Sequence, residues 1–233
     1  MLFKGKYEIL GTKVAACDYD FLLTKINQSI KSKKGLLIFP TASHSLVYSV
    51  FSKEEKEALK RFDYVVPDSQ WVRLSLGFLY GAWLPDRVYG PELTLRVCRL
   101  SQNKGYKIYL WGDEAKTLSK KLKKKFPKIK ISRDYGQAQI AFVGLGSPRQ
   151  EIFTSKTFYN KDIVAIPVGA AFDFISGKKP QAPYWMQKTG FEWFFRLIRE
   201  PGRLWKRYLI YAPLFVFLVL YQKLLLGLKS GLR

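Results

Sequence analysis

The sequence predicts an α/β protein, with a mostly parallel sheet carrying helices on both faces and a helical appendage at the C-terminal end. Short apolar runs alternate with amphipathic helical patterns along most of the chain, as in strands joined by crossover helices. With 233 residues, 48% hydrophobic and 25% charged, the chain can bury the core of one domain. We expect an α/β core over 1–190 and a basic, then apolar, appendage over 191–233, which closes the site and contacts a membrane.

The elements of the N-terminal part follow from local patterns. An amphipathic helix is predicted to start near Asp18 or Asp20, and Ser52 opens a capping-box-like SKEE inside a helical stretch. In chain order, the other patterns predict a strand or hairpin over 7–17, a strand over 35–39, helix over 45–62, and a strand, a PDS loop and a helix over 63–81.

The same alternation continues from residue 90 onward, where apolar runs of strand length separate longer helical patterns. In chain order it predicts helix over 91–105, strand over 106–112, helix over 114–126, strand over 129–134, and strands that end in loops within 139–151 and 162–174.

Small or polar residues directly follow four of the apolar strands, in the loops PTASHS, VPDSQ, VGLGSPRQE and VGAAFD. In an open parallel sheet, ligands bind at the carboxyl ends of the strands. We therefore expect these four loops on one rim and the functional site among them. The order of the strands does not follow from the pattern.

The charge of the chain points to a polyanionic partner. The formal net charge is +22, which leaves three classes open: nucleic acid, an anionic bilayer, or phosphorylated substrates. Lysine runs at 31–34 and 120–125 fit any of them. Aromatic residues make up 16% of the chain, many beside basic ones, and this fits a membrane interface at least as well as nucleic acid.

Cysteine and histidine usage gives no sign of a metal site or a disulfide framework. Cys17 and Cys98 are the only cysteines and His44 the only histidine, so we predict no metal and no other cofactor. His44 is interpreted as a polar loop side chain. The cysteine content favours a reducing cytoplasm, and the N-terminus lacks the apolar run of a signal peptide, so we do not expect export.

Two carboxylates follow strands on the expected rim. Asp68, in VVPDS, is explained equally well as a helix N-cap or as a general base at a strand end. Asp173, in VGAAFDF, is first interpreted as a turn carboxylate that holds a loop.

The loop VGLGSPRQE carries more information than either carboxylate. Gly144 and Gly146 allow close approach of the backbone to a ligand, and Ser147 is expected to cap the following helix. Backbone N–H groups at a helix start suit a phosphate. Gln150 and Glu151 are open to a simpler role, as polar groups that complement the helix dipole.

Six blocks taken together resemble a known family: VPDS, RVYGPEL, LWG, VGLGSPRQE, VGAAFDFISGK and the QAPYWMQKTG…RLIREPGRLWKRY block. In order and spacing they are similar to the WecG/TagA/CpsF glycosyltransferases, glycosyltransferase family 26, over residues 7–208. The resemblance implies a modified Rossmann-like sheet and an inverting bacterial enzyme with no clear metal requirement. Such enzymes move a sugar of the N-acetylmannosamine, uronic-acid or glucose type from a UDP-sugar to a polyprenyl-diphosphate-linked sugar. The reaction takes place at the cytoplasmic membrane face, in teichoic acid or surface polysaccharide synthesis.

The resemblance also implies roles for individual residues. Asp68 matches the aspartate proposed as the base that deprotonates the acceptor hydroxyl. The remaining matches are expected to bind substrate: Thr41, Ser43 (where the family has asparagine), Arg87, Gly144, Gly146, Gln150, Glu151, Gly169, Asp173, Arg196, Arg203 and Arg207.

The sequence departs from the family pattern at a few places. Ser43 replaces an asparagine, Ser69 a glycine, Glu92 an aspartate and Gln181 an arginine, and a helical segment usually found before the GLG strand is missing. These departures affect the expected identity of the donor sugar and the acceptor more than the expected type of reaction.

Arginines of the C-terminal block recur at steps of three or four residues. Arg199 falls on the same spacing as the matched Arg196, Arg203 and Arg207, so the four are expected on one face across two short helices, the second opened by Pro201. Guanidinium groups match phosphate oxygens. We therefore expect this segment to close over the rim and stabilise the departing diphosphate.

Residues 208–228 are apolar apart from Gln222 and Lys223, with aromatic and basic residues at both ends. A spanning helix needs about 20 apolar residues. An interfacial, monotopic segment is favoured, with a single span as the alternative. Two other functions stay open: a basic nucleic-acid-binding module, although no nucleic acid partner is expected, and a non-catalytic membrane scaffold. A homo-oligomer also stays open.

Overall fold

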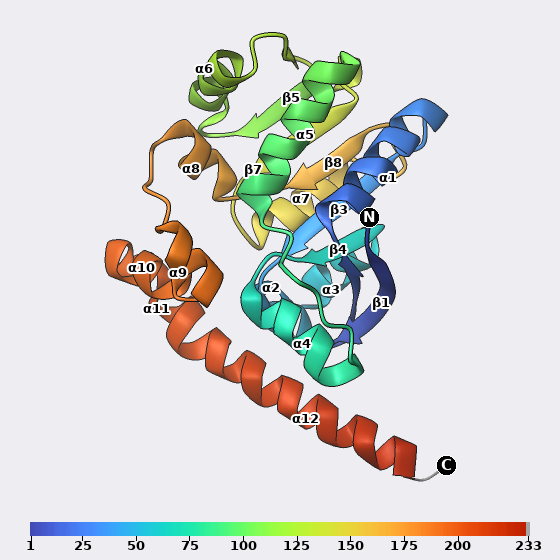
Figure 1. Cartoon of the computed structure of the whole chain (residues 1–233), viewed down its shortest axis with the longest axis vertical. Helices are drawn as coiled ribbons and strands as arrows, with labels where there is room; N and C mark the ends of the chain where they lie inside the picture. The colour runs from blue at the N-terminus through green and yellow to red at the C-terminus, as the bar shows by residue number, and fades with distance from the viewer. Residues whose placement is uncertain (232–233) are drawn as a thin grey trace.

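The structure, a computed structural model, describes residues 1–231, with side chains for residues 1–228. Figure 1 shows a body built around a central sheet, from which one long C-terminal helix extends past the lower edge.

Within residues 1–231 the sheet has eight strands, and only the first pair is antiparallel. This arrangement and the flanking helices confirm the predicted fold class. The strands lie in the order β1 (Phe3–Ile9), β2 (Thr12–Cys17), β4 (Tyr64–Pro67), β3 (Leu36–Thr41), β8 (Val164–Pro167), β7 (Ile140–Gly144), β5 (Lys107–Gly112) and β6 (Lys130–Ser132).

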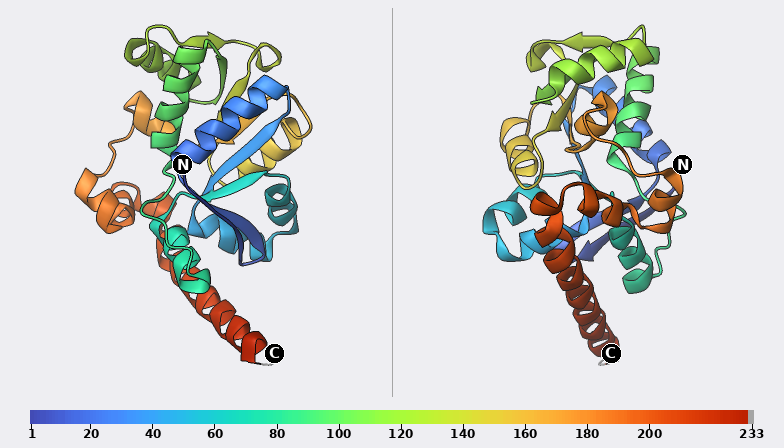
Figure 2. Two further views of the ribbon diagram at one scale, coloured as in Figure 1. Left: turned by 45° about the vertical axis from the view of Figure 1, so that its right-hand side comes forward. Right: turned by 90° about the vertical axis from the view of Figure 1, so that its left-hand side faces the viewer.

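Strand side chains alternate between the two faces of the sheet. They form one apolar cluster on each face, and the flanking helices pack on these clusters. One cluster lies under α1 (Tyr19–Ser32), α5 (Gly90–Lys104), α6 (Ala115–Lys125) and α8 (Ala171–Ser176). The other lies under α2 (Ser43–Phe51), α3 (Lys53–Lys60), α4 (Gln70–Tyr80) and α7 (Arg149–Thr157). Figure 2 shows this layering from two further directions.

Most predicted helix starts agree with the structure. Asp18 caps α1 by accepting a hydrogen bond from the Phe21 N–H at 2.8 Å. The stretch 45–62 is helical as predicted but divided at Ser52, whose Oγ accepts from the Glu55 N–H at 3.2 Å and starts α3. Only this half of the capping box forms, because the Glu55 side chain is fully buried and has no hydrogen-bond partner.

The cap of α4 is a correction to one interpretation of Asp68. Ser69, not Asp68, caps this helix, and its Oγ accepts from the Val72 N–H at 3.3 Å. The Asp68 carboxylate instead accepts from the Gly90 N–H of α5, at 2.6 Å. Asp68 is thereby placed at the rim between two helices rather than inside the first turn of one.

The C-terminal segment consists of short helices followed by a long one. Pro201 opens the second helix of the basic block, as predicted. The elements are α9 (Tyr184–Thr189), α10 (Glu192–Arg199), α11 (Pro201–Trp205), a π-helical turn η2 (Lys206–Tyr211) and α12 (Ala212–Gly231).

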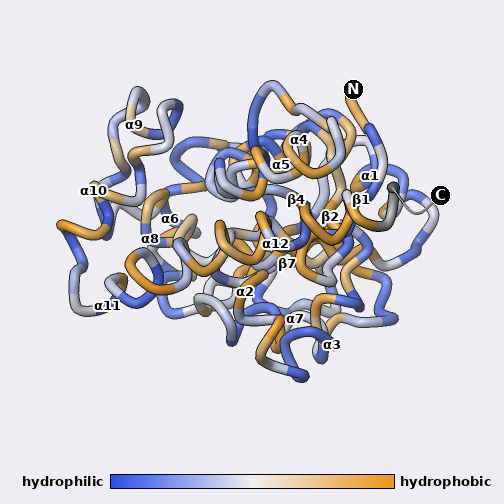
Figure 3. Tube along the Cα trace, turned by 90° about the horizontal axis from the view of Figure 1, so that it is seen from below, coloured by the Kyte–Doolittle hydropathy of each residue, from blue (hydrophilic) through white to orange (hydrophobic). Residues whose placement is uncertain are grey.

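Helix α12 is attached to the body along one side. Phe215 and Val219 are buried in the apolar cluster shared with α2 and α4. Gln222 accepts from the Leu10 N–H at 3.0 Å and donates to the Glu8 carbonyl at 2.7 Å, on the β1–β2 hairpin. Figure 3, a view from below, shows α12 as a largely hydrophobic helix crossing this face.

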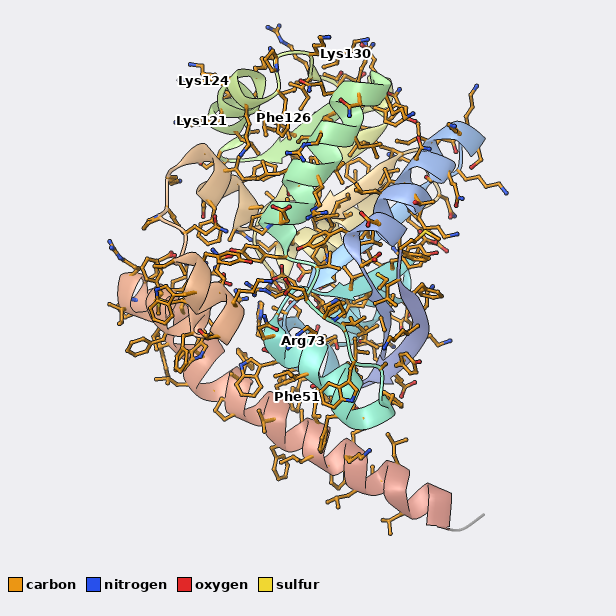
Figure 4. All side chains as sticks on the ribbon, viewed as in Figure 1. Phe51, Arg73, Lys121, Lys124, Phe126 and Lys130 are labelled. Atoms are coloured by element: carbon orange, nitrogen blue, oxygen red, sulfur yellow. The ribbon has the colours of Figure 1, made fainter. Side chains whose placement is uncertain are left out.

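By length and composition alone, the 28-residue helical segment Pro201–Leu228 is apolar enough to cross a membrane, and most of it is exposed. The lysine run of α6 lies elsewhere. Lys121 and Lys124 project at the opposite end of the molecule from α12 (Figure 4). The two ends of the molecule therefore carry different chemistry: basic around α6 and apolar along α12.

Candidate active site

The four loops expected on one rim follow four neighbouring strands. Strands β4, β3, β8 and β7 are adjacent and parallel in the centre of the sheet. Their carboxyl ends therefore meet at one edge, which brings together the loops that carry Ser43, Asp68, Gly146 and Gly169. This grouping required the strand order, which the sequence pattern does not give.

A small cavity of about 130 Å³ lies at this edge, and we call it the cation-lined cavity. Backbone of the strand-end loops and side chains from α2, α7, α10 and η2 form its wall. The residues expected from sequence that line it are Asp68, Gly146, Gln150, Gly169, Arg196, Arg203 and Arg207.

Asp68 sits at the wall with one carboxylate oxygen engaged. Its Oδ1 accepts from the Gly90 N–H, and its backbone carbonyl accepts from Arg87 Nη1 at 3.1 Å. Burial raises the pKa of Asp68, while the Arg87 charge and the Gly90 N–H oppose the shift. The result is a fixed carboxyl with a raised proton affinity, as a general base requires.

Arg207 is a cation without an ionic partner. Among residues 1–228 its guanidinium makes no ion pair and no hydrogen bond; it lies over the Tyr208 ring at 5.6 Å. Burial lowers the pKa of Arg207 to about 10, which still leaves it charged at neutral pH. A half-buried, charged and unpaired guanidinium beside a cavity is suited to an anion.

The other three arginines of the block differ in placement. Arg196 stays near Glu192, with Nη1 to Oε1 at 3.9 Å, and Arg203 Nε donates to Glu200 Oε2 at 2.7 Å. Arg199 does not reach the cavity, because it stacks on Phe195 and lines a separate pocket. The structure therefore brings three of the four arginines together rather than all of them on one face.

A buried polar network lies behind Asp68. Arg87 Nη2 forms an ion pair with Glu192 Oε2, and the Tyr89 hydroxyl donates to Glu192 Oε1 at 3.2 Å. Gln181, which stands where the family has arginine, donates to the Tyr89 hydroxyl at 3.0 Å. Because these groups satisfy one another, the network orients the Asp68 loop and attaches α10 to the core.

The GLGSPRQE loop uses its glycines for close approach. Gly146 has φ +74°, and Gly144 faces Phe172 so closely that a Cβ would lie 2.6 Å from the ring. Gly169 has φ +48°, and a Cβ there would lie 2.9 Å from Gln150 Oε1. Of these, Gly146 and Gly169 lie at the cavity wall, whereas Gly144 does not.

Ser147 does not cap α7, contrary to the sequence prediction. Its Oγ lies 2.9 Å from Ser45 Oγ, and Ser45 Oγ donates to Glu151 Oε1 at 3.2 Å. Both serines line the cavity, whereas Glu151 is fully buried behind them. Glu151 therefore holds the loop from within and does not touch the cavity.

Glu151 is close to a second buried acid, Glu55. Burial raises the pKa of both carboxyls, and the charge of Glu151 raises the pKa of Glu55 further. Both Glu55 oxygens and Glu151 Oε2 lack hydrogen-bond partners among the described residues. The two carboxyl groups therefore favour the protonated state. No sequence pattern distinguishes the buried Glu55 from the exposed glutamates beside it in α3.

The remaining expected residues lie outside the cavity. The Thr41 side chain is fully buried, and Ser43 lies at the start of α2, on the wall of the groove described next. Asp173 forms an ion pair with Lys179 at 3.0 Å, in keeping with a carboxylate that holds a loop. His44, interpreted from sequence as a loop residue, lies in the first turn of α2 and lines the cavity.

A larger, mainly apolar groove of about 650 Å³ begins at Asp68 and runs between α4 and α12; we call it the α4–α12 groove. Asp68, Arg196 and Arg207 line both the groove and the cation-lined cavity. The carboxyl and the two guanidinium groups therefore stand where the two spaces meet.

A third space, a wide cleft of about 800 Å³, opens between α5, α6 and α9. It shares Tyr89, Pro91 and Phe174 with the cavity wall, and Lys121, Lys124 and Lys125 of α6 also line it. Among residues 1–228, no cluster of three or more His, Cys, Asp or Glu side chains is placed to hold a metal ion.

Comparison with known proteins identifies the family of the chain. The model of the glycosyl transferase WecG/TagA/CpsF family matches residues 7–136 and 133–228. The chain belongs to this family. The two matches overlap at 133–136, a stretch that includes the first residues of the short turn η1 (Tyr135–Gln137).

Two relatives carry the same name, N-acetylglucosaminyldiphosphoundecaprenol N-acetyl-beta-D-mannosaminyltransferase. The one from Bacillus subtilis (strain 168) is 28% identical over 215 residues, which cover 83% of this chain and 82% of the relative. The one from Bacillus spizizenii is 27% identical over 212 residues, covering 82% and 81%. The shared name of these two relatives describes a lipid-linked, diphosphate-bearing acceptor.

Proposed function

We propose that this glycosyltransferase moves an N-acetylmannosamine-type sugar from a UDP-sugar to a polyprenyl-diphosphate-linked N-acetylglucosamine, with inversion, at the cytoplasmic membrane face. The observation that carries the proposal is the position of Asp68, Arg196 and Arg207, which line both the cation-lined cavity and the apolar groove. A base and two cations stand between a space suited to phosphate and a space suited to a lipid. The names of the two relatives support this choice of sugar and acceptor.

In this reaction the acceptor hydroxyl attacks the anomeric carbon of the donor sugar. A new bond forms between that oxygen and the carbon, the bond to the diphosphate breaks, and the hydroxyl proton passes to Asp68. The free carboxylate oxygen of Asp68 is the acceptor of this proton, because Oδ1 is held by the Gly90 N–H. The raised pKa of Asp68 makes it a stronger base than an exposed carboxylate.

The departing UDP gains negative charge as the bond breaks. Arg207, which has no ionic partner among residues 1–228, is the first candidate to stabilise it, with Arg196 and Arg203 beside it. Charge stabilisation by fixed groups in a water-poor site is a large contribution to catalysis. Gly146, with no neighbouring atom within 4 Å of where its Cβ would stand, leaves room for the diphosphate to approach the backbone.

The enclosed volume of the cavity suits a diphosphate better than a whole nucleotide sugar. The nucleoside must therefore extend beyond it. The wide cleft is the adjoining space, because it shares Tyr89, Pro91 and Phe174 with the cavity wall. Its tyrosines and lysines offer a ring surface and positive charge.

Membrane association follows from the lipid-borne acceptor and from α12. We propose that α12 lies in the interface rather than spanning it. Phe215, Val219 and Gln222 tie the helix to the globular body, which a spanning helix would have to leave. In this arrangement residues 191–233 serve both to close the site and to contact the membrane.

The direct test is turnover by the purified full-length chain with a panel of UDP-sugars and a short-chain polyprenyl-diphosphate-linked N-acetylglucosamine. UDP release that depends on both substrates, strongest with an N-acetylmannosamine donor, is the expected result. UDP release with a different donor would change the proposed donor sugar and leave the proposed reaction type unchanged. Absence of acceptor-dependent UDP release across the whole panel would overturn the proposal.

A further inference from the structure

One wall of the α4–α12 groove is a single stripe of α12. Pro213, Val216, Phe217 and Leu220 recur at the spacing i, i+3, i+4 and i+7, so they share a helix face. The facing wall includes Trp71, at the start of α4. The groove is therefore an apolar channel between two helices rather than a hollow in a loop.

The stripe is not needed to attach α12 to the body. Phe215 and Val219, on another face of the helix, are the buried contacts with the core. By contrast, Phe217 is 64% and Leu220 50% exposed. Large apolar side chains left in a groove beside a reaction centre are typical of a site for an apolar ligand.

The two ends of the groove have different chemistry. At the inner end stand Asp68, Arg196 and Arg207, where Arg207 has no ionic partner among residues 1–228. At the outer end, beyond Leu220, α12 continues with exposed Leu224 and Leu228. A ligand that fills the groove therefore needs an anionic or polar head at Asp68 and a hydrocarbon body directed along α12.

The length of the groove limits how much of such a ligand it covers. From Ala212 to Leu220 the helix rises by about 12 Å, which matches roughly two or three isoprene units in extended form. A volume of about 650 Å³ beside this stretch of helix is enough for a hydrocarbon chain of that length. The observations therefore favour a thin branched hydrocarbon chain.

We propose that the α4–α12 groove binds the first isoprene units of the acceptor lipid, with the diphosphate-linked sugar toward Asp68 and the rest of the chain passing into the bilayer. This inference rests on the proposed function and adds a lipid-binding site to it. It makes α12 part of the acceptor site as well as a membrane contact. Acceptor recognition then depends on the lipid and not only on the sugar.

The experiment compares two acceptors with the same diphosphate-linked N-acetylglucosamine, one carrying three isoprene units and one carrying a methyl group. Val216→Trp places a larger side chain in the groove. It is expected to lower kcat/KM for the isoprenoid acceptor roughly tenfold or more, because buried apolar area is lost, and to leave the methyl acceptor unchanged. Leu225→Trp, at an exposed position of α12 outside the groove and on a different helix face from the stripe, is the matched control and should change neither.

An equal loss of kcat/KM with both acceptors, or no loss with either, would overturn the groove assignment. A second measurement does not depend on turnover. Farnesyl diphosphate should quench the fluorescence of the wild-type chain, in which Trp71 and Trp193 line the groove, and Val216→Trp should raise the concentration for half-maximal quenching severalfold. If this binding is found while no UDP-sugar is turned over, the groove stands and the proposed function fails. If Val216→Trp binds farnesyl diphosphate as well as the wild type does, the groove assignment is wrong, whereas the proposed function is unaffected.

Discussion

Asp68 accepts one hydrogen bond from a backbone N–H and keeps its other carboxylate oxygen free, at the point where the cation-lined cavity meets the apolar groove. From sequence its two interpretations, N-cap and base, were equally good. The structure excludes the first interpretation for α4, because Ser69 caps this helix and the Asp68 side chain lies at the rim.

Asp68→Asn removes the proton acceptor while keeping the shape of the side chain. We expect kcat to fall by roughly 10²- to 10⁴-fold, the usual contribution of a general base, with UDP binding by calorimetry retained. Since burial raises the pKa of Asp68, wild-type turnover should also decline on acidification at a higher pH than an exposed carboxylate would give. Asp20→Asn, on the exposed side of α1, is the control. A variant at Asp68 with near-normal kcat would exclude the base role.

Arg207→Ala tests leaving-group stabilisation. Because the guanidinium lines the cavity and has no ionic partner among residues 1–228, its removal should cost about 10²-fold or more in kcat and weaken UDP binding. Arg199→Ala is the matched comparison, since Arg199 faces a separate pocket. The measurement is single-turnover UDP release. Equal losses in the two variants would mean that the cavity does not hold the diphosphate.

Glu55 and Glu151 give the folded protein a dependence on pH. Burial, and for Glu55 also the charge of Glu151, raises the pKa of each carboxyl above its ordinary value near 4.5. The folded state therefore holds protons that the unfolded state releases, and stability falls as pH rises above about 4.5 toward the raised values.

Glu55→Gln should flatten this decline. At pH 5 the variant and the wild type should be similar, and at pH 8.5 the variant should be more stable by about 1–3 kcal/mol. Urea unfolding across this pH range measures the difference. Glu57→Gln, an exposed position on the same helix, should leave the slope unchanged. Parallel stability curves for Glu55→Gln and wild type would mean that Glu55 is ionised in the folded protein.

At the scale of elements, helix starts were the part of the fold most open to prediction, because caps are local. Asp18, Ser52 and Pro201 mark the starts of α1, α3 and α11 as expected. Ser147 was wrongly expected to cap α7, because its hydroxyl finds Ser45, a partner about a hundred residues away in the chain. A long-range partner of this kind leaves no local pattern.

Ser69 stands where the family has glycine, and its role as the cap of α4 predicts a specific cost. Ser69→Ala should lower the free energy of unfolding by about 1 kcal/mol, whereas Ser69→Gly should lose only a few tenths. Thermal and urea unfolding of the two variants provide the comparison. An alanine variant as stable as wild type would show that the Val72 N–H finds another partner.

At the scale of the whole molecule, charge and apolar surface are separated. The lysines of α6 lie at one end, around the wide cleft, and α12 lies at the other. Among residues 1–228, many of the exposed large apolar side chains lie on α12 and on the helices beside it. The basic cleft and the proposed membrane contact are therefore separate surfaces. The sequence gives the number of basic and apolar residues but not where they lie on the molecule.

An interfacial α12 makes a prediction about membrane binding. The full chain should bind vesicles that contain anionic lipid, lose much of that binding as salt rises, and be released from membranes by alkaline carbonate. Co-sedimentation with vesicles at two salt concentrations, followed by carbonate extraction, checks this. Retention in the membrane after carbonate would favour the single span instead.

The sequence by itself determined the α/β class and the family and supplied candidate groups for the site, because alternating apolar runs, caps and ordered motif blocks are properties of neighbouring residues. Only the tertiary structure decided which groups meet. It placed Arg207 beside Asp68 and left Arg199 outside, and it buried Glu151 behind Ser45 and Ser147. It also placed the apolar C-terminal run along the wall of a groove that ends at Asp68. These outcomes depend on strand order and on contacts between residues far apart in the chain, which no local pattern records.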